Sequence, residues 1–376
     1  MKIGSVLSTA TKAAVLCVAL VFGILFASCG DGGGNVSGGG GGGGDGGGGG
    51  GGVSSSQTIT VPGGTLTEKL RWIRNNVQNG NTFIAEVSAD ETIASHLLSY
   101  GYKPDDVTII LRGSGGVRTI SGNGNEPIFD VGNYVILVLD NNITLRGQSN
   151  NDCELVRLIG GELVMNAGSR ITGNNRSSGG GGVYMSGGTF TMNGGEISGN
   201  TAAEFGGGVY MVGGNIVMNS GKISGNTVIS NPGGDGGGVF MNGGTFTMNG
   251  GEISGNTALN HGGGVYIFRG TLTMYGGEIS GNTAANHGGG LSLNYVGSGQ
   301  RGILRIVTGT IYGLDAVANL RNTVTDDLGS RDSAALFVVD SLANAQYGTF
   351  SGTTWNSAGS FPSTSETIRV VNGVLQ

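Results

Sequence analysis

Apolar and polar residues alternate in short runs through the middle of this chain, and the runs recur at a fixed interval. The segment 180–293 contains one motif almost four times, beginning GGGVYMSGGTFTMNGGEISGNTAAEF. Alignment on one apolar position gives steps of 26, 30, 26 and 26 residues, and the aligned residues are Val183, Val209, Val239, Val265 and Leu291. A fixed period of this size predicts a stacked repeat architecture.

Each repeat is expected to contain three short strands separated by glycine. These are Val183–Met185, Thr189–Met192 and Glu196–Ser198 in the first copy. Neighbouring residues of a strand point to opposite faces, so the motif divides its side chains into two sets. The expected inner set is Val183, Met185, Phe190, Met192 and Ile197, and the expected outer set is Tyr184, Thr189, Thr191, Glu196 and Ser198. Three strands and three glycine-containing corners in 26 residues predict one coil of a parallel β-helix.

A weaker form of the motif, an apolar residue followed two positions later by glycine, extends the repeat to about eight coils within 107–320. Its glycines are Gly122, Gly147, Gly173, Gly199, Gly225, Gly255, Gly281 and Gly313. Asparagine also recurs at one turn of successive coils, as Asn200, Asn226, Asn256 and Asn282. We expect these side chains to satisfy backbone groups that the turns leave unpaired.

The N-terminal segment has the pattern of an export signal. Lys2 and Lys12 precede an apolar run that ends in Leu25-Phe26-Ala27-Ser28-Cys29. Residues 1–28 are therefore interpreted as a lipoprotein signal peptide, and Cys29 as the lipidation site, with an ordinary cleaved signal or an uncleaved anchor as the alternatives. Residues 30–52 are nearly pure glycine, and 29–56 are interpreted as the lipidated Cys with a flexible tether.

Two further segments flank the repeats. In 57–106, Thr65 and Glu68 have the spacing of a capping box before an amphipathic stripe, and a strand pattern follows. This segment is interpreted as an N-terminal cap of helix plus strand, with a small separate binding domain as the alternative. Residues 321–376, with strand patterns at 334–339 and 367–375, are interpreted as a C-terminal β cap.

The repeats resemble two groups of known proteins. GGGVY and the Phe190–Asn193 stretch, repeated at Phe246–Asn249, resemble repeats of chlamydial polymorphic outer-membrane proteins. The signal, the tether, the LDNNITLRG stretch and the closing VNGVLQ resemble β-helix lipoproteins of spirochaetes. The resemblance implies an all-β fold, a right-handed, pectin-lyase-like parallel β-helix on the cell envelope. It also implies a function that is unassigned or adhesin-like.

Composition narrows the classes of partner. The chain contains 81 Gly and 5 Pro, only 12% of its residues are charged, and its net charge is −6. Nucleic acid is not expected as a partner, because its binding needs clustered Lys and Arg. Cys17, Cys29 and Cys153 have no spacing that indicates a disulfide framework or a zinc site, and Cys153 is expected to be a shielded thiol. No cofactor is expected.

An aromatic row is the candidate binding site. Tyr184, Tyr210, Phe240 and Tyr266 occupy one outer position on consecutive coils. Stacked rings suit contact with sugar rings or with a partner protein. The alternative is that the rings stabilise the sheet or lie under a loop.

Catalytic and metal-binding interpretations have weaker support. Glu196, Lys222, Glu252 and Glu278 recur because the repeat recurs, and Lys222 suggests charge compensation rather than a catalytic pair. His261 and His287 lie one coil apart and could share a metal, but no third ligand recurs at that turn. No cluster of non-repeated Asp with Arg or Lys is visible. The chain is thus expected to be a surface binding module anchored in the outer membrane by lipid, with a polysaccharide-degrading enzyme or a passive coat protein as alternatives.

The lipid anchor can be tested directly. Cells that express the protein and are fed a palmitate analogue should label the wild-type chain, because Cys29 would carry the acyl groups. The Cys29→Ala variant should carry no label. Label that persists in that variant would contradict the assignment.

Overall fold

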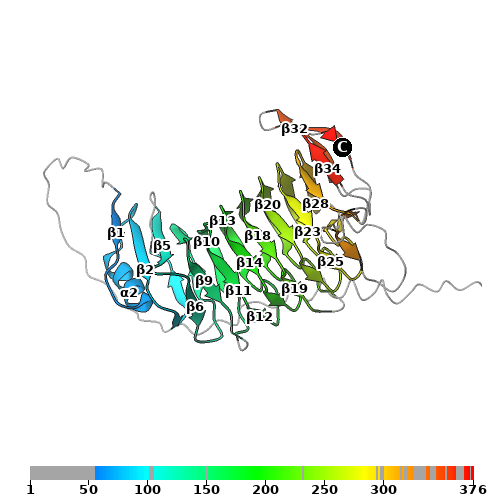
Figure 1. Cartoon of the computed structure of the whole chain (residues 1–376). Coiled ribbons are helices and arrows are strands. Elements are labelled where there is room, and N and C mark those ends of the chain that lie inside the picture. The colour runs from blue at the N-terminus through cyan, green and yellow to red at the C-terminus, as the bar shows by residue number, and fades with distance from the viewer. Residues whose placement is uncertain are drawn as a thin grey trace, which may run out of the picture. The chain divides into compact units, whose positions relative to one another are not determined.

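A computed structural model describes residues 56–100, 106–148, 151–230, 233–293, 295–296, 300–313, 316, 321–324, 336–338, 344–351, 354–360, 368–372 and 374–376. With 54% strand and 4% helix, the fold is all-β, a parallel β-solenoid of about nine turns (Figure 1). The expected fold class is confirmed, and the number of turns is close to the eight expected. The proposed signal peptide, Cys29 and nearly all of the tether lie outside the described residues.

The largest sheet contains two parallel tracks that run along the stack and share four ten-residue strands. The first track is β4 (His96–Leu98), β7 (Phe129–Val131), β10 (Val156–Met165), β13 (Val183–Met192), β16 (Val209–Met211), β20 (Val239–Met248), β23 (Val265–Met274), β26 (Leu291–Leu293) and β31 (Leu336–Val338). The second track is β1 (Thr58–Thr60), β2 (Thr82–Val87), β5 (Val107–Gly113), β8 (Val135–Leu139), β10, β13, β17 (Asn215–Met218), β20, β23, β28 (Gln300–Ile306) and β32 (Asn344–Ser351).

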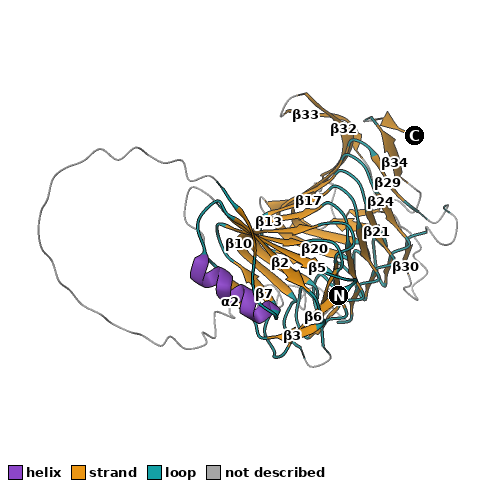
Figure 2. Cartoon of the chain, turned by 60° about the vertical axis from the view of Figure 1, so that its left-hand side comes forward, coloured by secondary structure: helices purple, strands orange, loops and turns teal. Residues whose placement is uncertain are grey.

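Two further parallel sheets complete each coil (Figure 2). One is β3 (Glu91–Ile93), β6 (Arg118–Gly122), β9 (Ile143–Arg146), β11 (Arg170–Thr172), β14 (Glu196–Ser198), β18 (Lys222–Ser224), β21 (Glu252–Ser254), β24 (Glu278–Ser280) and β29 (Gly309–Ile311). The other is β12 (Asn175–Arg176), β15 (Thr201–Ala202), β19 (Thr227–Val228), β22 (Thr257–Ala258), β25 (Thr283–Ala284) and β30 (Thr323–Val324). Antiparallel pairs add β27 (Tyr295–Val296), β33 (Thr354–Ser360), β34 (Ile368–Val371) and β35 (Val374–Leu375).

The strand pattern of a repeat differs from the expectation in two ways. The two expected strands Val183–Met185 and Thr189–Met192 join into the single strand β13, whereas in the next coil they remain separate as β16 and β17. The third sheet was not expected, because its strands are only two residues long and carry no alternation to read. Glu196–Ser198 forms β14 as expected.

The interior of the solenoid is apolar and continuous. The expected inner set is buried: Val183, Met185, Phe190 and Ile197 have no exposed surface, and Met192 is 1% exposed. The same positions repeat from coil to coil in exact register, so Met192 pairs with Met218 and Ile197 with Ile223. At the corner within β13, Gly188 has φ +81°, and a Cβ there would lie 2.1 Å from the Gly161 carbonyl oxygen, so only glycine fits.

A buried asparagine ladder runs along one turn of the coils. Its members are Asn151, Asn174, Asn200, Asn226, Asn256, Asn282 and Asn322, all at most 4% exposed. Asn226 shows the pattern: its Oδ1 accepts from the Asn200 backbone N–H at 3.1 Å, and its Nδ2 donates to the Ile197 carbonyl at 2.9 Å. The expected ladder is confirmed, and it is longer than expected because Asn151, Asn174 and Asn322 join it.

Helix α2 (Leu66–Asn76) lies at the N-terminal end of the stack, next to β2 (Figure 1). The capping box of Thr65 and Glu68 is confirmed, and Leu66 and Ile73 are buried on the core side of the helix. The carboxylate of Glu91 accepts from the Leu66 N–H at 2.8 and 2.9 Å, which fixes the helix to β3. Among the described residues, no helix has the length and apolar character needed to cross a membrane.

Replacement of Asn226 by alanine should destabilise the solenoid. The change leaves the Asn200 N–H and the Ile197 carbonyl buried without their partner, so we expect the free energy of unfolding to fall by about 3 kcal/mol. Urea unfolding followed by circular dichroism measures the effect. The control is Asn219→Ala, an exposed asparagine of the same coil, for which we expect a change of less than about 0.5 kcal/mol. Equal effects of the two changes would contradict the structural role of the buried ladder.

Candidate binding surface

The four aromatic residues that the sequence singles out form a continuous row, here named the aromatic ladder. The β-sheet register pairs Tyr184 with Tyr210, Tyr210 with Phe240, and Phe240 with Tyr266. Successive ring centroids lie 5.5, 5.3 and 5.3 Å apart, and the planes meet at 75°, 82° and 38°. The rings therefore meet mostly edge to face, a favourable aromatic geometry that forms a ridge rather than a flat platform.

Side chains from a neighbouring turn cover the middle of the aromatic ladder. The Phe205 ring lies 5.7 Å from Tyr210 and 4.6 Å from Phe240, and the His261 ring lies 6.0 Å from Tyr266. Phe240 and Tyr266 are each only 4% exposed, whereas Tyr184 and Tyr210 are half-buried. Burial raises the pKa of both half-buried tyrosines. Ligand binding by the ladder stays a prediction, and only Tyr184 and Tyr210 offer a ligand substantial surface.

The covering turn contributes one residue from each coil. Phe205 bridges to Asp235 and His261 to His287 in parallel register. The Asp235 carboxylate lies 3.1 Å from Nδ1 of His261, and the two histidine rings stack with centroids 5.5 Å apart. In the described part of the chain, no group of three His, Cys, Asp or Glu side chains is placed to hold a metal. These four residues, Phe205, Asp235, His261 and His287, are here named the turn column, and its rings cover part of the aromatic ladder.

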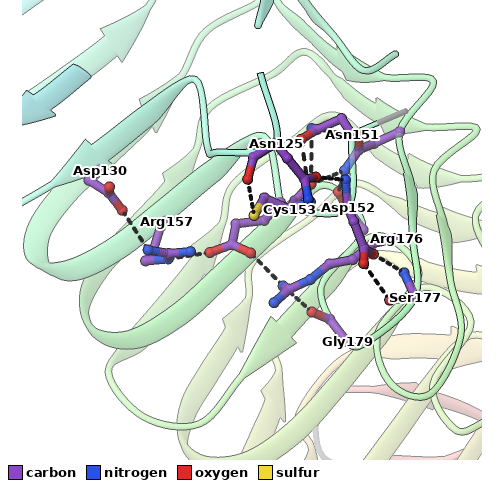
Figure 3. Close-up of polar contacts among 12 residues, drawn as sticks. Asn125, Asp130, Asn151, Asp152, Cys153, Arg157, Arg176, Ser177 and Gly179 are labelled. Carbon is purple, nitrogen blue, oxygen red and sulfur yellow. Dashed lines mark hydrogen bonds and ion pairs between the residues drawn. The ribbon is translucent and has the colours of Figure 1, made fainter. Parts of the chain in front are cut away.

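A charged cluster continues the same face toward the N-terminus and is here named the acid–arginine cluster (Figure 3). It consists of Asp130, Glu154, Arg157 and Arg176. Arg157 occupies the position of β10 that pairs with Tyr184, and Asp130 occupies the same position one coil earlier. The outer row therefore changes from acid to base to aromatic along the stack.

Glu154 is the centre of this cluster. Its side chain has no exposed surface, its Oε1 accepts from Nε of Arg157, and its Oε2 lies 2.5 Å from Nη1 of Arg176. Arg157 also reaches Asp130, with Nη1 3.5 Å from Oδ1. Arg176 donates in addition to the Gly179 carbonyl. The buried carboxylate is thereby neutralised by two guanidinium groups, one from β10 and one from β12.

The cluster raises the pKa of two of its members, Asp130 and Arg157. Burial raises the pKa of Asp130, and the charge of Arg157 offsets only part of this rise. Burial acts to lower the pKa of Arg157, but the charge of Glu154, the hydrogen bond to Glu154 and the charge of Asp130 act together to raise it. Arg157 is thus firmly cationic and half-exposed, beside Tyr184.

The loop that carries Glu154 is attached to the buried asparagine ladder. Nδ2 of Asn174 donates to the Cys153 carbonyl at 2.6 Å, and Nδ2 of Asn151 donates to the same carbonyl at 3.1 Å. Cys153 is half-buried, its Sγ lies 3.1 Å from the Asn125 carbonyl oxygen, and burial raises the pKa of its thiol, as expected for a shielded cysteine. Asp152 accepts from the Ser177 hydroxyl at 2.6 Å. These contacts hold the loop in place (Figure 3).

The acid–arginine cluster was missed by reasoning from the sequence. Its members come from two neighbouring coils whose sequences do not match the regular motif. One signal could have found it: alignment of β10 with β13 places Arg157 at the Tyr184 position. Glu154 had no such signal, because it lies in a turn.

The charge ladder on the second sheet is a row of ion pairs. Glu196, Lys222, Glu252 and Glu278 are in register. Nζ of Lys222 lies 2.8 Å from Oε2 of Glu252, and Glu196 pairs with Arg170. The hydrogen bond from Lys222 lowers the pKa of Glu252. The geometry supports charge compensation, as the sequence suggested.

The acid–arginine cluster should be important for stability. Glu154→Gln keeps the shape of the side chain but leaves two partly buried arginines without their shared counter-charge, so we expect the free energy of unfolding to fall by about 3 kcal/mol. The control is Glu196→Gln, which removes a partly exposed ion pair and should cost less than about 1 kcal/mol. Chemical denaturation of both variants measures the difference. A Glu154→Gln variant as stable as the control would refute the role of the cluster.

Comparison with known proteins assigns the chain to no family. No family model matches it. No curated protein and no solved structure matches it either.

Proposed function

We propose that this protein is a lipid-anchored cell-envelope protein whose parallel β-helix acts as a surface adhesion or binding module, with glycans as its ligand class. The N-terminal pattern ending in Cys29 supports the anchor, which would place the protein in the outer membrane of a bacterium and on its exposed side. The resemblance to pectin-lyase-like spirochaete lipoproteins belongs to the same proposal. A neighbouring surface protein is the alternative ligand.

The observation that carries the binding proposal is that the aromatic ladder and the acid–arginine cluster meet on one outer face. Tyr184 and Tyr210 are half-exposed aromatic rings, and Arg157 lies directly beside Tyr184 in the sheet register. An aromatic ring next to a rigid array of charged donors and acceptors can stack on the apolar face of a sugar and bond its hydroxyl groups. Because the rings form a ridge, we expect contact with one ring at a time.

The same face gives little support to the alternative of a polysaccharide-degrading enzyme. Glycoside hydrolysis needs two carboxyl groups that reach the substrate. Glu154 is fully buried and paired with two arginines, which leaves Asp130 as the one accessible carboxyl group of the cluster. We therefore favour binding over hydrolysis at this position.

A glycan array with the wild-type protein and the Tyr184→Ala/Tyr210→Ala double variant tests this function. We expect the wild-type protein to bind a subset of glycans and the double variant to bind them at least about tenfold more weakly, the equivalent of 1.4 kcal/mol. The matched control is Thr189→Ala/Asn215→Ala, which changes the other track of the same two coils. Thermal unfolding checks that all three proteins are folded.

Three results would contradict the proposal. One is the absence of glycan binding, and another is binding that the tyrosine changes do not affect. The third is the release of reducing or unsaturated sugars from a polysaccharide, which would favour the enzyme. Binding to intact neighbouring cells without glycan binding would favour the protein ligand instead.

A further inference from the structure

A second row of asparagine side chains lies on the outside of the solenoid and is here named the amide ladder. It consists of Asn166, Asn193, Asn219 and Asn249, and Tyr275 occupies the next position. These residues are structurally equivalent: the backbone N–H of each donates to the carbonyl of the last residue of the second-track strand one coil earlier, as Asn219 does to Met192 at 2.8 Å. Asn193, Asn219 and Asn249 are exposed, unlike every member of the buried asparagine ladder.

Hydrogen bonds between side chains align the amide ladder. Nδ2 of Asn219 donates to Oδ1 of Asn193 at 2.8 Å, and Nδ2 of Asn249 donates to Oδ1 of Asn219 at 2.8 Å. At the N-terminal end, Nδ2 of Asn166 donates to Oδ1 of Asp140 at 3.2 Å, and Arg112 pairs with that carboxylate at 2.9 Å. The amides therefore all point the same way, and the carboxylate anchors the row.

The amide ladder retains unused hydrogen-bonding capacity that faces solvent. An amide group has two N–H donors and two acceptor lone pairs. Asn219 uses one of each within the row, which leaves one donor and one acceptor for a ligand. The next residue after Asn193 and after Asn249 is glycine, and a Cβ at Gly194 or Gly250 would lie 2.8 Å from backbone atoms. A larger side chain therefore does not fit at Gly194 or Gly250, where it would cover the neighbouring amide.

Tyr275 interrupts the row with an aromatic ring. It is 42% exposed, the most accessible large aromatic side chain in the described part of the chain. It occurs where the repeat would place asparagine, so it is a local exception to the repeat. An exposed ring in line with amide groups offers the flat apolar contact that a sugar ring uses, next to the donors and acceptors that its hydroxyl groups use.

We propose that the amide ladder and Tyr275 bind a neutral, linear glycan whose chain lies along the axis of the stack. Sugar hydroxyl groups donate and accept at once, as does each aligned amide. Of the neighbouring charges, Lys222 pairs with Glu252 and Arg170 with Glu196, and the remaining Glu278 is acidic, so an anionic polymer gains no attraction here. This inference goes beyond the proposed function, because it uses a different row of side chains and does not require the aromatic ladder to bind.

The length of the row predicts the length of glycan that it can contact. Coils stack at the strand spacing of about 4.8 Å, so the four steps from Asn166 to Tyr275 span about 19 Å. A glycan that lies along the row should gain affinity with each added sugar until it covers this length. Longer oligosaccharides should bind no more tightly per chain.

Isothermal titration calorimetry with cello-oligosaccharides and manno-oligosaccharides of two to eight sugars tests the proposal. The full chain is used. Hexagalacturonate is the charged comparison, and a short peptide that is disordered when free but rich in strand-favouring residues is the polypeptide comparison. We expect affinity for at least one neutral series to rise with length and then level off. Tyr275→Ala and Asn219→Ala/Asn249→Ala should each weaken that binding about tenfold or more.

Matched variants separate this site from the aromatic ladder. Asn215→Ala removes an exposed asparagine of the same coil outside the row and should leave binding unchanged. Tyr184→Ala/Tyr210→Ala should also leave this binding unchanged. A loss of binding in one set of variants therefore tests the amide ladder and the aromatic ladder independently. Thermal unfolding confirms the fold of each variant. The proposal is overturned if no neutral oligosaccharide binds, if the amide-ladder variants bind as the wild type does, or if the peptide or the charged glycan binds more tightly.

Discussion

The buried asparagine ladder is the interaction on which the rest of the solenoid depends. Each coil turns a corner that leaves backbone N–H and carbonyl groups inside the molecule, where water does not reach them. An asparagine side chain has the donors and acceptors to satisfy an N–H and a carbonyl group of the neighbouring coil, as Asn226 does for Asn200 and Ile197 one coil earlier. The apolar interior could not be stacked coil upon coil without this row, because each corner would bury unpaired polar groups.

The ladder also explains how coils of unequal length stack in register. Successive members are separated by 23, 26, 26, 30, 26 and 40 residues, yet from Asn174 onward the backbone N–H of each donates to Oδ1 of the next, and Asn151 reaches Asn174 through its side-chain amide. Extra residues must therefore leave the coil between two ladder positions and return before the next one. The constraint acts on the corner and on the inner faces of the strands, whereas the outer turns remain free to vary.

The outer surface varies where the interior repeats. Along one row, Asp130 and Arg157 give way to Tyr184 and then to rings that the turn column covers. Along another row, exposed amides end at Tyr275. The same residue type, asparagine, stabilises the fold where it is buried and offers hydrogen bonds to solvent where it is exposed. A solenoid of this kind combines a uniform core with a surface that is specific at a few coils, and the functional proposals concern those coils.

The sequence by itself determined the parallel β-helix, the inner and outer residue sets and the buried asparagine ladder. These follow from two periodicities, alternation within a strand and recurrence near 26 residues, which are visible in one dimension. The tertiary structure alone decided that β13 is a single strand, that Phe240 and Tyr266 are buried while Tyr184 and Tyr210 stay partly exposed, and that Glu154 joins Arg157 and Arg176. Each of these depends on contacts between turns of different coils, where the sequence does not repeat and side-chain position is set by packing rather than by spacing.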